Sequence, residues 1–416
     1  MIISDWPRAI AHVDADCFFA ACEQLRRPDL AGRPICVMSS QDACVVAKTY
    51  DAKAAGITTG MPVWEAKKLM PQAMFLPADF RFYGLLSGKL FAILRRYSPQ
   101  VETYSIDEGF VDLDGLRAYW RMGYGEIGDA IRQAIHDETG LTVSVGVSVT
   151  RTLAKMASEA NKPNGFSVVS GRHIVEFLAG QQTQDIPGIG SRRAALLRKF
   201  NINTALEFAR TPEAQVQRLL GRGGMDLWHE LNGKSLFGLE LHSPLPKSMA
   251  RTASMGQRTP DIRLVRAHLS HHCFRLAMDM VARGLLARRF SVQLRLANFE
   301  RVVLTENMSQ ATQHLHAMQR ATTHLLHGLW QEGMEVNGCG IVATEIIPSG
   351  HTQTEMFSAG GYKTDHEAND LPLWQTMQQM RSRFGNSIIR PANTLLRSAA
   401  SRSHACRFGY PLFVCK

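Results

Sequence analysis

The stretch Tyr104-Ser-Ile-Asp-Glu-Gly-Phe-Val-Asp-Leu113 sets two carboxylates, Asp107 and Glu108, side by side directly before a glycine. Its alternation of apolar and polar residues predicts a β-strand, on which neighbouring side chains face opposite ways. A hairpin tip or bulge, which Gly109 permits, would bring both acids to one point. Two carboxylates about 4 Å apart repel by roughly 4 kcal/mol at an effective dielectric near 20. A hard divalent cation would offset that repulsion, whereas a solvated surface turn is the ordinary alternative.

The composition indicates a basic, multidomain protein of 416 residues. A net charge of +10 and a pI near 9.3 favour a polyanionic partner. No run of 18 apolar residues predicts a membrane span, and the N-terminus, with Asp5 and Pro7, lacks the features of a signal peptide. The eight cysteines include no Cys-x-x-Cys pair, so we expect reduced thiols in a cytoplasmic protein.

A second pair of acids lies near the start of the chain. Residues 9–16 predict a short apolar strand that ends in Asp14 and Asp16, and a helix is expected from Cys17 to Leu25. The period of two along a strand places Asp14 and Asp16 on the same face. One acid at this position is usually a helix cap. Two acids just before the aromatic pair Phe18-Phe19 are not explained by a cap alone.

Residues 33–79 predict a small separate unit, punctuated by glycine and proline. We expect strands at 34–38 and 43–47 and helices at 50–55 and 63–70. Three polar or cationic residues lie around its strand-to-helix junction: Lys48, Tyr50 and Lys53. Free backbone N–H groups at such a junction suit a phosphate, and a solvated helix face is the alternative.

Further along, helices are predicted over 82–97, 124–139 and 152–161, with a strand over 141–149. The last of these helices stops at the turn Lys162-Pro-Asn-Gly165, which carries a cation at its entry. Strands and helices mixed in this order predict an α+β sheet domain with the small unit inserted.

From 173 to 240 the pattern is helical throughout. Ile186-Pro-Gly-Ile-Gly190, followed by a basic helix, is typical of a helix-hairpin-helix, whose glycines bring backbone N–H groups close to a phosphate. A weaker copy occurs at Gly221-Arg-Gly-Gly224. The DNA-contact candidates in this section are Gly188, Gly190, Arg192 and Arg193.

Residues 247–346 predict a split β-α-β unit. The expected order is strand 250–257, helix 262–283, strand 291–297, strand 301–306, helix 310–328 and strand 338–346. Twelve Lys and Arg against seven Asp and Glu indicate a basic polar face. The histidines fall on helix faces that we expect to be solvated, without a ligand spacing, so they do not predict a metal site; they are His268, His271, His272, His314, His316, His324 and His327.

The tail from 347 onward is rich in Ser, Gly, Thr and Asn and contains Gln353-Thr-Glu-Met-Phe357. A short amphipathic helix is expected from Leu373 to Phe384, stopped by Gly385. Its apolar side would carry Trp374, Met377, Met380 and Phe384, and simple packing against the body is its plainest use. The last twenty residues are expected to be disordered.

Three motifs resemble the Y-family translesion DNA polymerases, particularly the bacterial DNA polymerase IV type. They are His12-Val-Asp-Ala-Asp-Cys-Phe-Phe19, Tyr104-Ser-Ile-Asp-Glu108 and Asn161-Lys-Pro-Asn-Gly165, in that order. The resemblance implies a multidomain, right-hand α+β polymerase. Its parts would be a palm with a mixed sheet (1–22 and 80–172), fingers (23–79), a helical thumb (173–240), a βαββαβ little finger (247–346) and a flexible tail (347–416).

The resemblance also implies the functional residues. The metal ligands would be Asp14, Asp107 and Glu108, with the carbonyl of Ala15, whereas Asp16 matches an acid that is not usually a ligand. The nucleotide would be held by Phe19, Tyr50, Lys53 and Lys162. Lys53 stands where arginine is usual, which replaces a bidentate contact with a point charge. Gly109 stands where alanine is usual, a small change expected to leave the metal site intact.

The implied activity is low-fidelity, template-directed DNA synthesis across damaged DNA with two Mg²⁺ ions. The implied partners are primer-template DNA, dNTP and a sliding clamp, the last bound through Gln353, Met356 and Phe357. Arg251 and Arg295 would contact DNA, and we expect a monomer. A catalytically weak, DNA-binding relative is the alternative, which the three carboxylates oppose. A nucleotide cyclase is opposed by the hairpin motif and the net charge.

Overall fold

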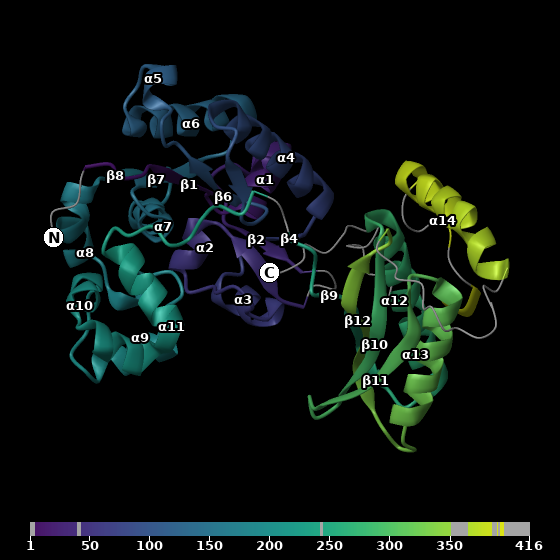
Figure 1. Cartoon of the computed structure of the whole chain (residues 1–416). Coiled ribbons are helices and arrows are strands. Elements are labelled where there is room, and N and C mark those ends of the chain that lie inside the picture. Colours follow the sequence, from purple (N-terminus) through teal and green to yellow (C-terminus); the bar gives the residue numbers. More distant parts are fainter. Residues whose placement is uncertain are drawn as a thin grey trace. The chain divides into compact units, whose positions relative to one another are not determined.

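The computed structural model describes residues 5–39, 43–241, 244–350, 365–384, 389 and 392–394 (Figure 1). The chain forms two compact units, Met1–Ser243 and Pro244–Lys416. Within the described ranges, no helix combines the length and the apolar character that a membrane crossing requires.

A five-stranded sheet forms the centre of the first unit, in the order β5-β6-β1-β7-β8. The strands are β1 (Ile10–Ala15), β5 (Val101–Thr103), β6 (Glu108–Asp112), β7 (Val143–Ser148) and β8 (Phe166–Val169). β1 pairs antiparallel with both β6 and β7. This arrangement brings the two acidic segments of the sequence onto neighbouring strands.

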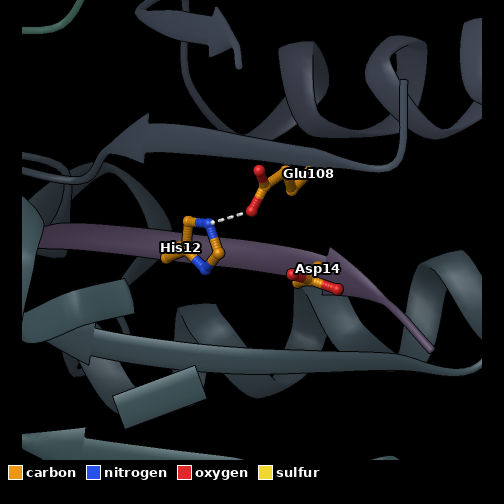
Figure 2. Close-up of side chains that lie close together, drawn as sticks. All are labelled: His12, Asp14 and Glu108. Carbon is orange, nitrogen blue, oxygen red and sulfur yellow. Dashed lines mark ion pairs between the residues drawn. The ribbon is translucent and has the colours of Figure 1, made fainter. Parts of the chain in front are cut away.

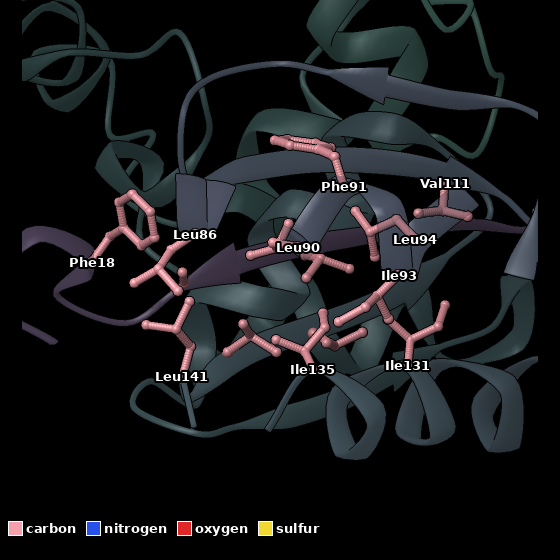
Figure 3. Close-up of a cluster of buried hydrophobic side chains, with 14 of the residues drawn as sticks. Phe18, Leu86, Leu90, Phe91, Ile93, Leu94, Val111, Ile131, Ile135 and Leu141 are labelled. Atoms are coloured by element: carbon pink, nitrogen blue, oxygen red, sulfur yellow. The ribbon is translucent and has the colours of Figure 1, made fainter. Parts of the chain in front are cut away.

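Alternation along the strands assigns the two faces of this sheet to different helices. Val13 and Val111 face an apolar core built with α4 (Phe80–Tyr97) and α6 (Tyr124–Thr139) (Figure 3). α1 (Phe18–Arg26) adds Phe18 to that core. Ile10 and Phe110 face α7 (Arg151–Ala160) on the other side. The short α5 (Arg117–Trp120) precedes α6.

The inserted unit has a three-stranded sheet in the order β3-β2-β4 and a small core of its own. Its elements are η1 (Pro28–Leu30), β2 (Ile35–Met38), β3 (Val45–Lys48), α2 (Tyr50–Ala54), α3 (Val63–Leu69) and β4 (Met74–Pro77). β4, which pairs parallel with β2, was not expected from the sequence.

The section after the sheet is helical, as predicted, and packs around a core that it shares with α7 and the end of β8. Its elements are η2 (Gly171–His173), α8 (Ile174–Ala179), η3 (Thr183–Asp185), α9 (Ser191–Arg198), α10 (Ala205–Arg210) and α11 (Glu213–Leu231). Gly221, in the weaker glycine motif, has φ 64° and interrupts α11. Only glycine adopts this backbone conformation readily. Gly221 therefore divides α11 into two helical segments joined at a kink.

The second unit confirms the split β-α-β order. Its strands β9 (Ser248–Thr259), β10 (Leu285–Leu296), β11 (Arg301–Thr312) and β12 (Val336–Pro348) form an antiparallel sheet in the order β11-β10-β12-β9. α12 (Ile262–Arg283) and α13 (Leu315–Leu329) pack on one face of it. α13 starts later than the predicted 310–328 because residues 310–312 continue β11.

Two sequence expectations in the second unit are wrong. His268 and His272 are buried on α12 rather than solvated, because the helix is covered by the sheet and by α14 (Asp365–Phe384). The buried side of α14 carries Trp374 and Arg381, whereas Phe384 is exposed. Trp374 and Met377 pack against the core as predicted, whereas the predicted Met380 is exposed as well. Arg381 takes part in the packing instead, with its guanidinium 5.0 Å from the Phe274 ring centre. The helix also begins earlier than the predicted Leu373. The remaining described element is η4 (Ala392–Thr394).

Candidate active site

The acidic segments meet where β1 and β6 reach the same edge of the sheet. Asp14 lies directly opposite Glu108 in the antiparallel register. The Ala15 N–H donates to the carbonyl oxygen of Asp107 at 2.9 Å. The structure therefore brings the three predicted acids and the predicted backbone ligand onto adjoining segments at this edge, and ligand atoms of Asp14 and Glu108 lie within 4.8 Å of each other.

A serine fixes the loop that carries Asp107. The Ser105 hydroxyl donates to Asp107 Oδ1 at 2.5 Å and accepts from the N–H groups of Asp107 (3.2 Å) and Glu108 (3.0 Å). The Tyr104 and Ser105 N–H groups both donate to the Glu108 carbonyl. These hydrogen bonds close the hairpin loop and fix the directions in which the side chains of Asp107 and Glu108 project from it.

Gly109 is needed for close packing and not for a turn. It lies inside β6, opposite Val13, and does not have a positive φ. A Cβ at this position would lie 2.6 Å from a ring carbon of Phe91 and 2.8 Å from the backbone oxygen of Glu102. The expectation that Gly109 frees a turn is wrong. The close Cβ contacts predict that glycine in place of alanine is more than a small change here.

A second glycine brings α7 onto the acidic face of the sheet. A Cβ on Gly146 of β7 would lie 2.2 Å from the Ala154 carbonyl oxygen and 2.3 Å from the Ser158 nitrogen. Because α7 approaches so closely, its side chains reach β1 and β6. Lys155 Nζ pairs with Glu108 Oε2, and Ser158 Oγ lies 2.7 Å from Nδ1 of His12.

The sequence motifs assign no role to His12 or Lys155, although both contact Glu108. His12 is fully buried, and its Nε2 lies 3.3 Å from Glu108 Oε2 (Figure 2). Lys162 Nζ pairs with Asp14 Oδ1 and with Glu159 Oε1, both at 2.8 Å. Lys155 and Glu159 are spaced by four residues, which was the signal that they share one side of α7, whereas Lys162 lies in the turn just after this helix.

The carboxylates differ in how they hold protons. Burial raises the pKa of Asp14 to about 7 against the opposing effect of Lys162. Burial also raises the pKa of Asp107, although its hydrogen bond with Ser105 opposes this. Burial acts in the same direction on Glu108, but its contacts with His12 and Lys155 outweigh it and lower the pKa of that carboxyl. Asp14 therefore needs a further positive charge nearby to ionise fully at neutral pH.

Asp16 does not join Asp14, so the period-two expectation is wrong. β1 ends at Ala15, and the chain turns at Cys17, whose φ is 46°. The buried Asp16 carboxylate accepts from Ser144 Oγ at 2.8 Å and from the Asn164 N–H at 2.7 Å. Asp16 thus holds the turn that carries Lys162.

The predicted nucleotide contacts lie on elements next to the acids. Tyr50 begins α2, and its hydroxyl lies 3.4 Å from Asp16 Oδ1. Lys53 Nζ lies 5.8 Å from the Tyr50 ring centre and is exposed. Phe19 is partly exposed and stacks on Tyr83 at 4.6 Å.

The predicted DNA contacts of the helical section are two glycines, which offer backbone groups, and two arginines with exposed side chains. Gly188 has φ 91°, and its carbonyl accepts from the guanidinium of Arg193 at 2.9 Å. Gly190 caps α9, and Arg192 and Arg193 are exposed in its first turn.

In the second unit the two predicted arginines have different surroundings. Arg295 lies on the sheet face opposite the helices and donates to Asn337 and Ser254, both at 2.6 Å. Arg251 is buried on the helix-covered face and pairs with Asp279, so its assignment as a DNA contact is wrong. Strand alternation separates the two faces but does not say which one helices cover. The predicted clamp contacts Gln353, Met356 and Phe357 lie outside the described residues.

A sheet with acids at one edge, a small inserted unit, a helical section and a split β-α-β unit define a polymerase of the right-hand class. Residues 13–159 match the impB/mucB/samB family, and residues 246–356 match the impB/mucB/samB family C-terminal domain. The chain belongs to this family of Y-family DNA polymerases, which confirms the predicted resemblance. It is a DNA-directed DNA polymerase of the translesion class.

Relatives and solved structures cover most of the chain. The DNA polymerase IV of Methanoculleus marisnigri is 31% identical over 324 residues, which are 77% of this chain and 89% of the relative. The DNA polymerase IV of Bacillus velezensis is 27% identical over 98% of this chain and 97% of its own. A solved Y-family DNA polymerase chimera of Dbh and Dpo4 has a TM-score of 0.68 at 22% identity, over 82% of this chain and 99% of its own. This last similarity supports the predicted fold.

Proposed function

We propose that this polymerase joins nucleotides to a primer with two Mg²⁺ ions held by Asp14, Asp107, Glu108 and the Ala15 carbonyl. The observation that carries the proposal is the register of Asp14 opposite Glu108, with Asp107 in the adjoining loop. Oxygen ligands of this kind suit Mg²⁺. The raised pKa values of Asp14 and Asp107 fit a site in which the protein alone supplies too little positive charge.

The bound ions would activate the primer 3′-hydroxyl and stabilise the leaving pyrophosphate. The residues of the chain have separate tasks around them. Ser105 holds Asp107 in position, and Lys155 holds Glu108. Asp16, through the Asn164 N–H, keeps the turn that carries Lys162 beside Asp14.

The nucleotide would lie between α2 and this turn. Lys162 and Lys53 would pair with phosphate oxygens whose charge grows during the transfer, and the Tyr50 hydroxyl would donate to the same phosphates. Lys162 Nζ pairs with Asp14 Oδ1, so its ammonium is directed at the proposed reacting centre. The Phe19 ring, held against Tyr83, would lie beneath the sugar.

The palm, fingers, thumb and little finger are proposed within the boundaries given above. The α9 N-terminus, with Gly188, Gly190, Arg192 and Arg193, would hold a phosphate of the DNA backbone. Arg295 would contact DNA from the open sheet face of the second unit. We further propose a monomer that binds a sliding clamp through Gln353-Thr-Glu-Met-Phe357.

Primer extension on undamaged and lesion-containing templates tests the proposal. With Mg²⁺ and dNTPs, the full chain should extend the primer on both templates and misinsert readily on the undamaged one. Extension that needs no divalent ion would contradict the metal assignment. DNA binding without any extension would favour the catalytically weak relative.

A further inference from the structure

Two buried arginines of the second unit each leave a hydrogen-bond donor without a partner. They are Arg251 on β9, which is 6% exposed, and Arg381 on α14, which is 9% exposed. Among the described residues, none accepts from Nη1 of Arg251 or from Nε of Arg381. Buried polar groups in proteins are rarely left unpaired. The two donors therefore indicate that an acceptor from outside the described chain binds here.

The charges around these two donors are unbalanced. Arg251 donates through both Nε and Nη2 to a single oxygen of Asp279 on α12. Arg275 lies one turn before Asp279 on the same helix, and its charge acts on Arg381 together with the charges of Arg251 and Asp279. Burial and the two neighbouring cations lower the pKa of Arg381, against the effect of Asp279. Three guanidinium groups and one carboxylate thus leave an excess of two positive charges.

A ligand for this cluster has to accept hydrogen bonds and carry negative charge. Arginine offers donors only, and its planar guanidinium matches the oxygens of phosphate-like anions. An excess of two charges suits a dianion, whereas a phosphodiester group of DNA carries a single charge. Duplex DNA is also too wide to reach side chains that are buried to this extent. The cluster lies on the helix-covered face of the sheet, opposite the open face from which Arg295 is proposed to contact DNA.

We propose that β9, α12 and α14 form a binding site for a small tetrahedral dianion of the phosphate or sulfate class. Arg251 Nη1 and Arg381 Nε would donate to its oxygens, and Arg275 would add charge. The ligand is a free ion and not a part of DNA. This inference does not rest on the proposed function, because none of these residues belongs to the site of nucleotidyl transfer.

The ion has to displace part of the contact between α14 and α12, because the two free donors are sealed from solvent. Arg381 lies in the last turn of α14, which ends at Phe384, and the side chain of Asp279 is 27% exposed. The cluster therefore lies just beneath the surface at the end of a helix, where a small outward shift of the last turn admits an ion. Without the ion, like charges oppose the packing of α14. With the ion bound, α14 should be held more firmly.

Hydrogen exchange of α14 in the full chain tests the inference, in chloride buffers of constant ionic strength without DNA or nucleotide. Sodium phosphate should slow amide exchange in α14 at least threefold and saturably, and sulfate should do the same. Arg381→Met should abolish this response. It should also slow the exchange of α14 in chloride alone, because it removes a cation that the packed helix buries without a full set of partners. Arg383→Met changes an exposed arginine of the same turn and is the matched control, which should respond to phosphate like the parent.

Exchange of α14 that does not change in phosphate would overturn the inference and needs no variant. An equal response in Arg381→Met would overturn it as well, since phosphate would then act only through its general exclusion from protein surfaces. Phosphate that binds at the proposed nucleotide site would likewise leave Arg381→Met with the parent's response. A deoxynucleoside monophosphate separates the sources of the phosphate group, because a response to it alone would contradict a site for a free ion. Thermal melts establish that Arg381→Met is folded, and Arg381→Gln replaces it if it is not.

Discussion

Replacing Gly109 by alanine tests how closely the catalytic hairpin packs on the palm core. The new Cβ would lie 2.6 Å from Phe91, which is about 1 Å inside ordinary carbon contact. Phe91 is buried in the core, and the second neighbour is the backbone oxygen of Glu102, which cannot rotate away. Overpacking of this kind costs about 1–3 kcal/mol. Alanine is more favourable than glycine within a strand by roughly 0.5–1 kcal/mol, which partly offsets this cost. We therefore expect the free energy of unfolding to fall by about 1–2 kcal/mol.

Thermal and urea unfolding of the first unit measure this loss, and Mg²⁺ titration of primer extension measures the displacement of Glu108, the residue before Gly109. Gly88→Ala is the matched control, because a Cβ on Gly88 of α4 meets nothing within 4 Å. Adding Phe91→Leu to Gly109→Ala removes the closest contact and should recover part of the stability. If Gly109→Ala unfolds like the parent within about 0.5 kcal/mol and needs no more Mg²⁺, the close-packing argument is wrong.

Three further predictions concern the exclusion of ribonucleotides, the protonation of Asp14 and the binding of a sliding clamp. Phe19→Ala should admit ribonucleotides at least tenfold better by single-nucleotide incorporation, whereas Phe18→Ala, in the core, should mainly lower the melting temperature. Because Asp14 has its pKa raised from 3.8 to about 7, the folded metal-free protein holds a proton that the unfolded chain releases, so its stability falls as pH rises through that window. Mg²⁺ must displace the same proton, so calorimetry should show its affinity falling about tenfold per pH unit below 7. Alanine at both Met356 and Phe357 should abolish clamp-dependent processivity and leave distributive synthesis unchanged.

Elements with strong local signals could be predicted from the sequence. α6 has the predicted bounds because an amphipathic pattern ends at Gly140, which takes the left-handed conformation at the helix C-terminus. β4 was missed because four residues paired parallel to β2 show no alternation. Arg251 was assigned to DNA because alternation separates two faces without saying which face helices cover.

The three carboxylates could be predicted because they lie in short, recognisable motifs, whereas the groups that hold them could not. Lys155 reaches Glu108 only because Gly146 allows α7 to approach the sheet. His12 belongs to one of those motifs, but the motif does not show that its ring contacts Ser158 of α7. Contacts of this kind depend on the packing of distant segments, which local patterns do not encode.

Single-turnover incorporation of a dNTP by Asp107→Ala and Glu108→Ala, with Mg²⁺ and a primed template, tests the central claim most directly. Loss of one carboxylate should remove several kcal/mol of transition-state stabilisation, so we expect incorporation to fall below detection. Binding of the primed template, measured on the same samples, should survive because the proposed DNA contacts lie on other elements. Incorporation within tenfold of the parent in either variant would contradict the assignment of these acids to the metal site.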